Sequence, residues 1–232
     1  MRLWCALLLA LPGMLSATGV ARAGEVLRVC FGYGCSETVP VRFLEHELAS
    51  LAVLFAGVGG AAGVGDAVAH AVGELYRVAG GQTPVFMDRG GNYADDEAYG
   101  RMDCIDHSTT TTHMLGLMAR RGWLRFHEVV EPARRTRIFT QHFSARMRER
   151  SGTDDALRIG GGKGDHVAVM LALCDCPDVV EDLAPRPVQS TDTLLKPEPG
   201  EFVVDSWFRE NGEPAVVMPL AEWMNGEGPD VE

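Results

Sequence analysis

The stretch "GRMDCIDHSTTTTHMLGLMARRGW", residues 100–123, decides how the middle of this chain folds and raises the question of what its cysteine does. Asp103 is a helix-capping residue type that stands directly before Cys104. Steps of four, seven, eleven and fourteen residues from Cys104 reach Ser108, Thr111, Leu115 and Met118. This spacing predicts a helix that begins at Cys104 and buries these side chains on one face. The four consecutive threonines are small, and we expect them to let the first turns approach a sheet closely.

Around this helix, the hydrophobic pattern predicts helices first and strands later. Val26 to Phe31 has the composition of a strand, and apolar residues at helical spacing predict a helix over Phe43 to Phe55. Asp66 is placed to cap a second helix, Ala67 to Ala79. The later predicted strands are Leu124 to Val130, Arg137 to Arg148, His166 to Cys174 and Glu201 to Phe208, and a short helix or turn follows at Pro219 to Gly226. This order is typical of an α+β fold with helices on one side of a mostly antiparallel sheet.

The N-terminal 23 residues have the pattern of a secretory signal. Met1 and Arg2 precede an apolar run, and Ala21-Arg22-Ala23 ends it with the small residues of a cleavage site. Because Pro12 and two glycines interrupt the apolar run, we expect no stable membrane anchor. We therefore predict a signal peptide over residues 1–23 and a single domain over residues 24–232 that is periplasmic or secreted.

The chain is acidic, with 21 basic and 32 acidic residues and a formal net charge of −11. Two of the basic residues, Arg2 and Arg22, lie in the predicted signal, so 19 basic and 32 acidic residues leave a charge of −13 on the rest. Nucleic acid and anionic membrane surfaces are poor partners for such a chain. The charge therefore excludes neither an enzyme nor a protein-binding module, but it disfavours a nucleic-acid-binding protein.

Five cysteines follow the predicted signal, an odd number for an exported protein. They are Cys30, Cys35, Cys104, Cys174 and Cys176. Cys30 and Cys35 flank the turn-like "FGYG" and are placed to pair. Cys174 and Cys176 have the choice of pairing with each other or with the first two. Cys104 is the natural candidate for a free thiol.

Cys104 needs a basic partner to act as a nucleophile near neutral pH. A helix N-terminus favours a thiolate by only about 0.3 to 1 kcal/mol, against a free-thiol pKa near 8.5. Two histidines on predicted strands are candidates for this partner, His142 in "TRIFTQHFSARMRER" and His166 in "GDHVAVMLALC". Asp205 in "FVVDSWF" is costly to bury without a partner and is the candidate for orienting the imidazole. Trp207, two residues on, is placed to wall the pocket.

A cysteine at a helix start, then a histidine strand, then an aspartate strand resembles the transglutaminase-like cysteine enzymes, in particular bacterial transglutaminase-like cysteine peptidases. The resemblance covers roughly residues 100–208 and rests on "MDCIDHSTTTT", "QHFSARM" and "FVVDSWF". It implies a transglutaminase/papain-like core with Cys104 as the nucleophile, His142 as the imidazole and Asp205 as the orienting acid. The chain after the signal also resembles uncharacterised exported proteobacterial proteins, which implies no activity by itself.

The resemblance implies that residues 152–200 are an insertion in a hairpin. This insertion carries its own histidine, and if its apolar strand is central, His166 takes the place of His142. The implied reaction is acyl transfer from an amide bond of a protein or peptide substrate, as in a peptidase or a transglutaminase. The Cys104 N–H is a natural oxyanion donor, and Gln82 and Asn92 are candidates for a second.

Two other classes of function fit parts of the sequence. Cys104-x-x-His107 together with Cys174-x-Cys176 offers soft ligands for zinc or copper, although the spacing is not that of common zinc modules. A non-catalytic binding domain on the same fold would keep Cys104 buried and unreactive. We expect no cofactor, because the glycine-rich segments at residues 57–65 and 160–164 do not fit nucleotide-binding motifs.

Overall fold

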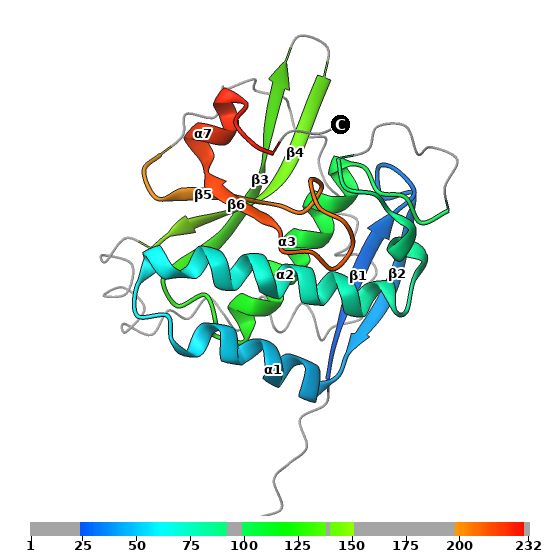
Figure 1. The fold of residues 1–232 in the computed structure, drawn as a ribbon, viewed down its shortest axis with the longest axis horizontal. Coiled ribbons are helices and arrows are strands. Elements are labelled where there is room, and N and C mark those ends of the chain that lie inside the picture. The colour runs from blue at the N-terminus through cyan, green and yellow to red at the C-terminus, as the bar shows by residue number, and fades with distance from the viewer. Residues whose placement is uncertain (1–23, 92–98, 138–139, 151–197, 230–232) are drawn as a thin grey trace, which may run out of the picture.

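The computed structural model describes residues 24–91, 99–137, 140–150 and 198–229, which form helices and two antiparallel sheets (Figure 1). The small sheet pairs β1 (Glu25–Phe31) with β2 (Glu37–Phe43). The larger sheet has the order β3-β4-β5-β6, with β3 at His127–Arg137, β4 at Thr140–Glu149, β5 at Glu201–Asp205 and β6 at Val216–Pro219. The predicted α+β class is confirmed. The predicted signal, the strand at 166–174 and nearly all of the insertion at 152–200 lie outside the described residues.

Helix α3 (Cys104–Arg120) runs between the two sheets and contacts both (Figure 1). Its predicted start is confirmed: the Asp103 carboxylate accepts hydrogen bonds from the Ile105 and Asp106 amides, and Asp106 caps the Asp103 amide in return. The predicted inner face is also buried, with Ser108, Thr111, Leu115 and Met118 inside. Cys104 heads this face but is only partly buried, which leaves its thiol within reach of the surface.

Two of the threonines hydrogen-bond to groups outside the helix. The Thr110 hydroxyl accepts the Cys30 amide of β1 at 3.0 Å, and the Thr111 hydroxyl lies 2.9 Å from the Ser206 hydroxyl just after β5. Hydrogen bonds between a helix side chain this short and a neighbouring strand require close packing. The threonines therefore tie α3 to both sheets, a more specific role than the small size that the sequence suggested.

The hairpin of β1 and β2 docks on the first turn of α3. Of the pairings that the sequence left open, the structure forms Cys30–Cys35, and this disulfide closes a turn whose four residues, 32–35, all have positive φ. The Tyr33 and Cys35 amides donate to the buried Asp106 carboxylate, and the Gly34 amide donates to Asp103. The turn thus fixes the helix end that carries the free thiol.

Strand β2 was not predicted, because Pro40 lies in its middle and its outer half is exposed. A proline lacks the amide that a central strand requires, so a strand with proline must lie at a sheet edge, and β2 does. Strand β6 was also missed, since four residues after Pro214 are too short to show a pattern. Both strands owe their conformation to a partner strand rather than to their own residues.

The first two helices cover the front and bottom of the molecule in Figure 1. Helix α1 (Glu45–Ala56) buries Leu48, Leu51 and Phe55, as the spacing predicted. Helix α2 (Val64–Gly80) follows the 3₁₀ turn η1 (Ala61–Gly63) and begins three residues before its predicted start. Asp66 is therefore inside the first turn instead of capping it, where its charge still favours the helix dipole. The glycine-rich segment before it is partly helical, not only a connector.

Strand β5 is covered on both faces, which explains its apolar sequence. Val204 packs in the main core with the long helices, whereas Val203 packs against Leu220 and Trp223 of the short helix α7 (Leu220–Asn225). Helices therefore lie on both sides of the larger sheet, not on one side as predicted. Side chains alternate along a strand, so Asp205 points to the same face as Val203, toward α7. The strand ends at Asp205, three residues before the predicted end.

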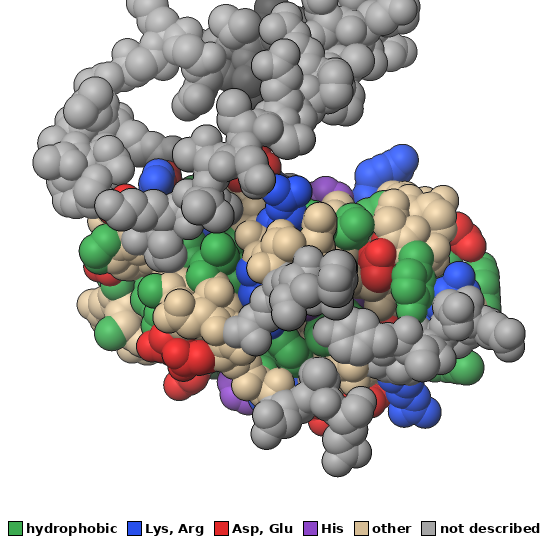
Figure 2. All heavy atoms as spheres, turned by 90° about the horizontal axis from the view of Figure 1, so that it is seen from above, with side chains coloured by type: hydrophobic (Ala, Val, Ile, Leu, Met, Phe, Trp, Pro, Cys, Tyr) green, Lys and Arg blue, Asp and Glu red, His purple; other side chains and the backbone are tan. Residues whose placement is uncertain are grey.

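No helix among the described residues is long and apolar enough to cross a membrane. Acidic and basic side chains are interspersed over the face shown in Figure 2, with hydrophobic side chains between them. The negative net charge is therefore not gathered into one patch on that face.

Candidate active site

The structure brings together the three residues that the sequence singled out. Cys104 is the first residue of α3, His142 lies on β4, and Asp205 ends the neighbouring strand β5. The Cys104 thiol is 3.9 Å from the backbone carbonyl of Gln141, the residue before His142. His142 Nε2 is 2.7 Å from Asp205 Oδ2, and Cys104 is close enough to the same imidazole to help raise its pKa.

Asp205 is buried, with 1% of its surface exposed, and its carboxylate has three donors. Besides His142, the Trp223 indole N–H donates to Oδ2 at 2.9 Å, and the Trp207 amide donates to Oδ1 at 3.3 Å. A buried carboxylate is tolerated when donors satisfy it, and here α7 supplies one of them. The acid in an otherwise apolar strand is explained by this arrangement.

Aromatic rings surround the His142 imidazole. The ring centroids of Trp207, Phe208 and Trp223 lie 5.0, 5.4 and 5.6 Å from that of His142. Burial alone would lower the pKa of His142, but the hydrogen bond to Asp205 and the nearby Cys104 outweigh it and raise the pKa from 6.5 to about 9. The ring is therefore held in one orientation and is protonated at neutral pH. Trp207, which the sequence suggested as a wall of the site, packs against this imidazole.

Cys104 is the free cysteine among the described residues, since Cys30 and Cys35 form the disulfide. The Asp103 carboxylate caps the second and third amides of α3, not the first. Within the described part of the chain, no acceptor takes the Cys104 N–H, so this amide is open at the helix end beside the thiol. Such an amide is suited to stabilise a negatively charged oxygen.

Gln82 is not a second oxyanion donor, contrary to that hypothesis. Its amide is fully engaged with the Arg42 backbone, because Nε2 donates to the Arg42 carbonyl at 2.8 Å and Oε1 accepts the Arg42 amide at 3.0 Å. Gln82 therefore ties the end of α2 to β2. The other candidate, Asn92, lies outside the described residues, as does His166.

His107 does not face Cys104, so the proposed Cys104-x-x-His107 half of a metal site is not formed. The two nitrogens of its ring are taken by Asp88 and Ser206, at 2.9 and 2.8 Å. Cys174 and Cys176, the other half, lie outside the described residues. Within the described ranges, the geometry of a metal site is met by Cys30, Cys35 and Asp106, but the two sulfurs are already bonded to each other.

The buried contact of His107 with Asp88 and Ser206 was missed by the sequence reasoning. Asp88 lies in the acid-rich stretch that follows the short η2 turn (Pro84–Met87), and nothing in its spacing marks it as buried. The one available signal was Ser206, a polar residue directly after Asp205 and within an apolar segment.

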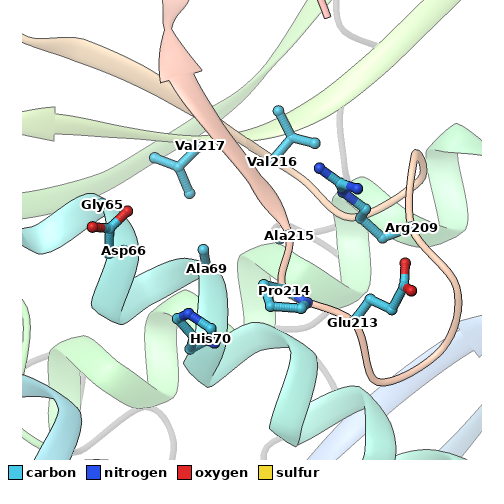
Figure 3. Close-up of a pocket in the computed structure, with 10 residues that line it drawn as sticks. All are labelled: Gly65, Asp66, Ala69, His70, Arg209, Glu213, Pro214, Ala215, Val216 and Val217. Carbon is cyan, nitrogen blue, oxygen red and sulfur yellow. The ribbon is translucent and has the colours of Figure 1, made fainter. Parts of the chain in front are cut away.

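A cavity of about 460 Å³ opens between α2 and the connection from β5 to β6 (Figure 3). Asp66 and His70 of α2 lie across it from Arg209 and Glu213 of that connection. Its walls carry charges of both signs, and none of the three residues Cys104, His142 and Asp205 lines it. The cavity is therefore separate from the candidate site.

Comparison with models of known protein families, with curated proteins and with solved structures finds no match for this chain. The site is therefore interpreted from its own geometry.

Proposed function

We propose that this chain is an exported cysteine-dependent acyl-transfer enzyme that acts on amide bonds of proteins or peptides. The observation that carries the proposal is one imidazole, His142, which is hydrogen-bonded to the buried Asp205 and lies next to the partly exposed Cys104, whose thiol contacts the carbonyl of the preceding residue, Gln141. A nucleophile, a base and a group that orients the base are the three elements of covalent acyl transfer.

In this proposal the Cys104 thiol proton resides on His142, and the resulting thiolate attacks the carbonyl carbon of an amide. The negatively charged oxygen of the resulting tetrahedral intermediate accepts a hydrogen bond from the Cys104 N–H. His142 then gives its proton to the leaving amine, the carbon–nitrogen bond breaks, and a thioester remains on Cys104. In a peptidase, water gives a proton to His142 and attacks the thioester; the carbon–sulfur bond breaks, an acid leaves and the Cys104 thiolate is restored. In a transferase, an amine substrate takes the place of water and leaves as a new amide.

The raised pKa of His142 supports the first step. An imidazole with a pKa of about 9 is basic enough to take up and keep a proton at pH 7, as the base of the proposed reaction must. Asp205 favours the protonated imidazole because its carboxylate accepts a hydrogen bond from the Nε2–H. The partial exposure of Cys104 is the opposite of what the alternative, a non-catalytic binding domain with a buried thiol, requires.

The arrangement of the elements supports a transglutaminase/papain-like core. The cysteine heads a helix, the histidine and aspartate lie on the antiparallel neighbours β4 and β5, and the helix packs on that sheet. This is the order of elements that the resemblance to transglutaminase-like cysteine peptidases implies. The Cys30–Cys35 disulfide is compatible with an exported protein, periplasmic or secreted, as the N-terminal sequence predicts.

The test is the rate of Cys104 alkylation as a function of pH, in protein whose Cys174 and Cys176 are replaced by serine. Cys30 and Cys35 do not react while they form the disulfide. We expect His142→Ala to lower the rate at pH 7 by about tenfold, since a free thiol is only about 3% ionised there and a thiolate of lower basicity is a weaker nucleophile. His113→Ala is the matched control, because His113 is an exposed histidine on the same helix.

Equal alkylation profiles in wild type and His142→Ala would reject the enzyme proposal. Mass spectrometry of the wild type after incubation with peptides, quenched in acid, then tests for the acyl group on Cys104. Hydroxylamine should remove that group, because it cleaves thioesters.

A further inference from the structure

A second buried histidine and aspartate lie beside the candidate triad and join a serine. His107, Asp88 and Ser206 have only 4%, 3% and 6% of their surfaces exposed. His107 Nε2 is 2.9 Å from Asp88 Oδ2, and His107 Nδ1 is 2.8 Å from the Ser206 hydroxyl. The proposed acyl-transfer reaction uses none of these three side chains, so their burial calls for another explanation.

Their hydrogen bonds form a closed network. The Ser206 hydroxyl lies 2.9 Å from the Thr111 hydroxyl and 3.3 Å from that of Tyr76, and Tyr76 also lies 3.2 Å from Thr111. The Asp88 carboxylate accepts a backbone amide on its other oxygen, so it acts as an acceptor and His107 Nε2 is the donor. Buried polar networks in which the members are satisfied hold their segments rigidly.

The network binds residues on both sides of Cys104 in the sequence. Asp88 accepts the amide of Met102, two residues before Cys104, and binds the ring of His107, three residues after it. The entry to α3 and its first turn are thereby attached to one carboxylate. The segment that carries Asp88 is also attached to the chain just after β5, because the Gly91 amide donates to the Trp207 carbonyl at 2.7 Å.

The network also includes the residue that follows Asp205 of the candidate site. Ser206 directly follows Asp205, and its hydroxyl binds α3 at both His107 and Thr111. One serine therefore connects the strand end that carries the orienting acid to the helix that carries the thiol. A shift of either element would change the distance from the thiol to the imidazole, and reacting groups tolerate little misplacement.

Although serine, histidine and aspartate follow one another here as in a hydrolase triad, Ser206 is not a reaction centre. Its hydroxyl is buried and already shared between His107, Thr111 and Tyr76. A substrate carbonyl has no access to it, so any influence on the reaction must pass through the residues that it holds.

We infer that Ser206, His107 and Asp88 are positioning residues, which clamp the first turn of α3 to the end of β5 and so hold Cys104 within reach of the His142–Asp205 pair. The inference rests on the proposed function, since it gives these residues a role in the reactivity of that site. It assigns to the clamp an effect on Cys104 chemistry that is separate from its effect on folding.

Two neighbouring threonines give a matched test. Thr111 and Thr110 are both buried in α3, but the Thr111 hydroxyl binds Ser206 of the clamp, whereas the Thr110 hydroxyl binds the Cys30 amide. Thr111→Val removes the clamp hydroxyl at nearly constant volume, Thr111→Ser keeps it, and Thr110→Val is the control. Ser206→Ala, where it folds, removes the central hydroxyl.

The measurements are the alkylation rate of Cys104 against pH and the thermal unfolding of each variant. We expect Thr111→Val to lower the rate at pH 7 by about fivefold, the equivalent of one neutral hydrogen bond, with the greatest loss at acidic pH. A thiol displaced from its imidazole is protonated there. Ser206→Ala should change the profile at least as much, whereas Thr111→Ser and Thr110→Val should keep the profile of the wild type.

The outcomes separate this inference from the proposed function. If His142→Ala alters the profile while Thr111→Val and Ser206→Ala only lower the unfolding temperature, the residues are structural and the inference is wrong. If Thr110→Val alters the profile as much as Thr111→Val, the effect is general to buried threonines and the inference is again wrong. If His142→Ala itself changes nothing, the proposed function fails before the clamp is considered.

Discussion

Two buried pairs of histidine and aspartate lie close together in this molecule, and they differ in their third partner. His142 Nε2 binds Asp205 at 2.7 Å, and the partly exposed thiol of Cys104 lies nearby, in contact with the Gln141 carbonyl. His107 Nε2 binds Asp88 at 2.9 Å, and its other side faces the buried hydroxyl of Ser206. The pair alone therefore does not make a reactive site, because a nucleophile must also be open to a substrate.

The surroundings of the two pairs differ as well. Aromatic rings and the Trp223 indole surround the first pair, and the thiol of Cys104 lies near its imidazole. Hydroxyls surround the second pair and bind one another. The first environment keeps one polar group available for chemistry, whereas the second occupies its polar groups with one another.

The strongest test of this comparison is Asp88→Ala. It removes the acceptor of both the His107 ring and the Met102 amide in a buried site, and we expect the free energy of unfolding to fall by about 3 to 5 kcal/mol. Chemical denaturation measures this loss. Glu210→Ala is the matched control, because it removes a carboxylate from the exposed pair with Arg89 and should cost under about 1 kcal/mol. Similar losses in both variants would show that the second pair is not a structural clamp.

The pH dependence of stability should belong to the first pair. The pKa of His142 is raised from 6.5 to about 9, so the folded state binds the proton more tightly than the unfolded state. The stabilisation, about 3 kcal/mol, is fully present below pH 6.5 and is lost as the pH rises through 9.

Denaturation of the wild type and of Asp205→Asn at several pH values measures this loss. The slope between pH 6.5 and 9 should flatten in Asp205→Asn, because the amide no longer favours the imidazolium. Asp88→Asn should keep the slope of the wild type. A slope that survives in Asp205→Asn and disappears in Asp88→Asn would reverse the roles of the two pairs.

A smaller effect is expected at the aromatic wall. Trp223→Phe keeps a ring beside His142 but removes the indole N–H that donates to Asp205, and we expect a loss of about 1.5 to 3 kcal/mol. Calorimetric unfolding measures this loss of stability. Trp123→Phe is the control, because the Trp123 ring stacks on Phe55, and this variant should lose less stability. Equal losses in the two variants would mean that the indole hydrogen bond contributes nothing measurable.

Local rules explain what could be predicted. Capping and helical spacing act within a few residues, and they place the start of α3 at Cys104 and its buried face correctly. Asp205 could be singled out because a buried acid in an apolar strand demands a partner, and the described structure pairs it with His142, which the resemblance had favoured over His166. The hypothesis of a second oxyanion donor at Gln82 failed because the side chain found the backbone of β2 instead.

The sequence by itself determined the class of the fold, the helix that presents Cys104 and the need of Asp205 for a partner, because these depend on short-range spacing and on the cost of burying a charge; His142 was preferred to His166 only through the resemblance in the order of elements. Only the tertiary structure decided that β2 and β6 are strands, that α7 supplies a donor to Asp205, and that His107 binds Asp88 and Ser206 instead of assisting the thiol. His107 and Ser206 are 99 residues apart in the chain. Which polar groups meet across such a separation depends on how whole elements pack, and no local pattern contains that information.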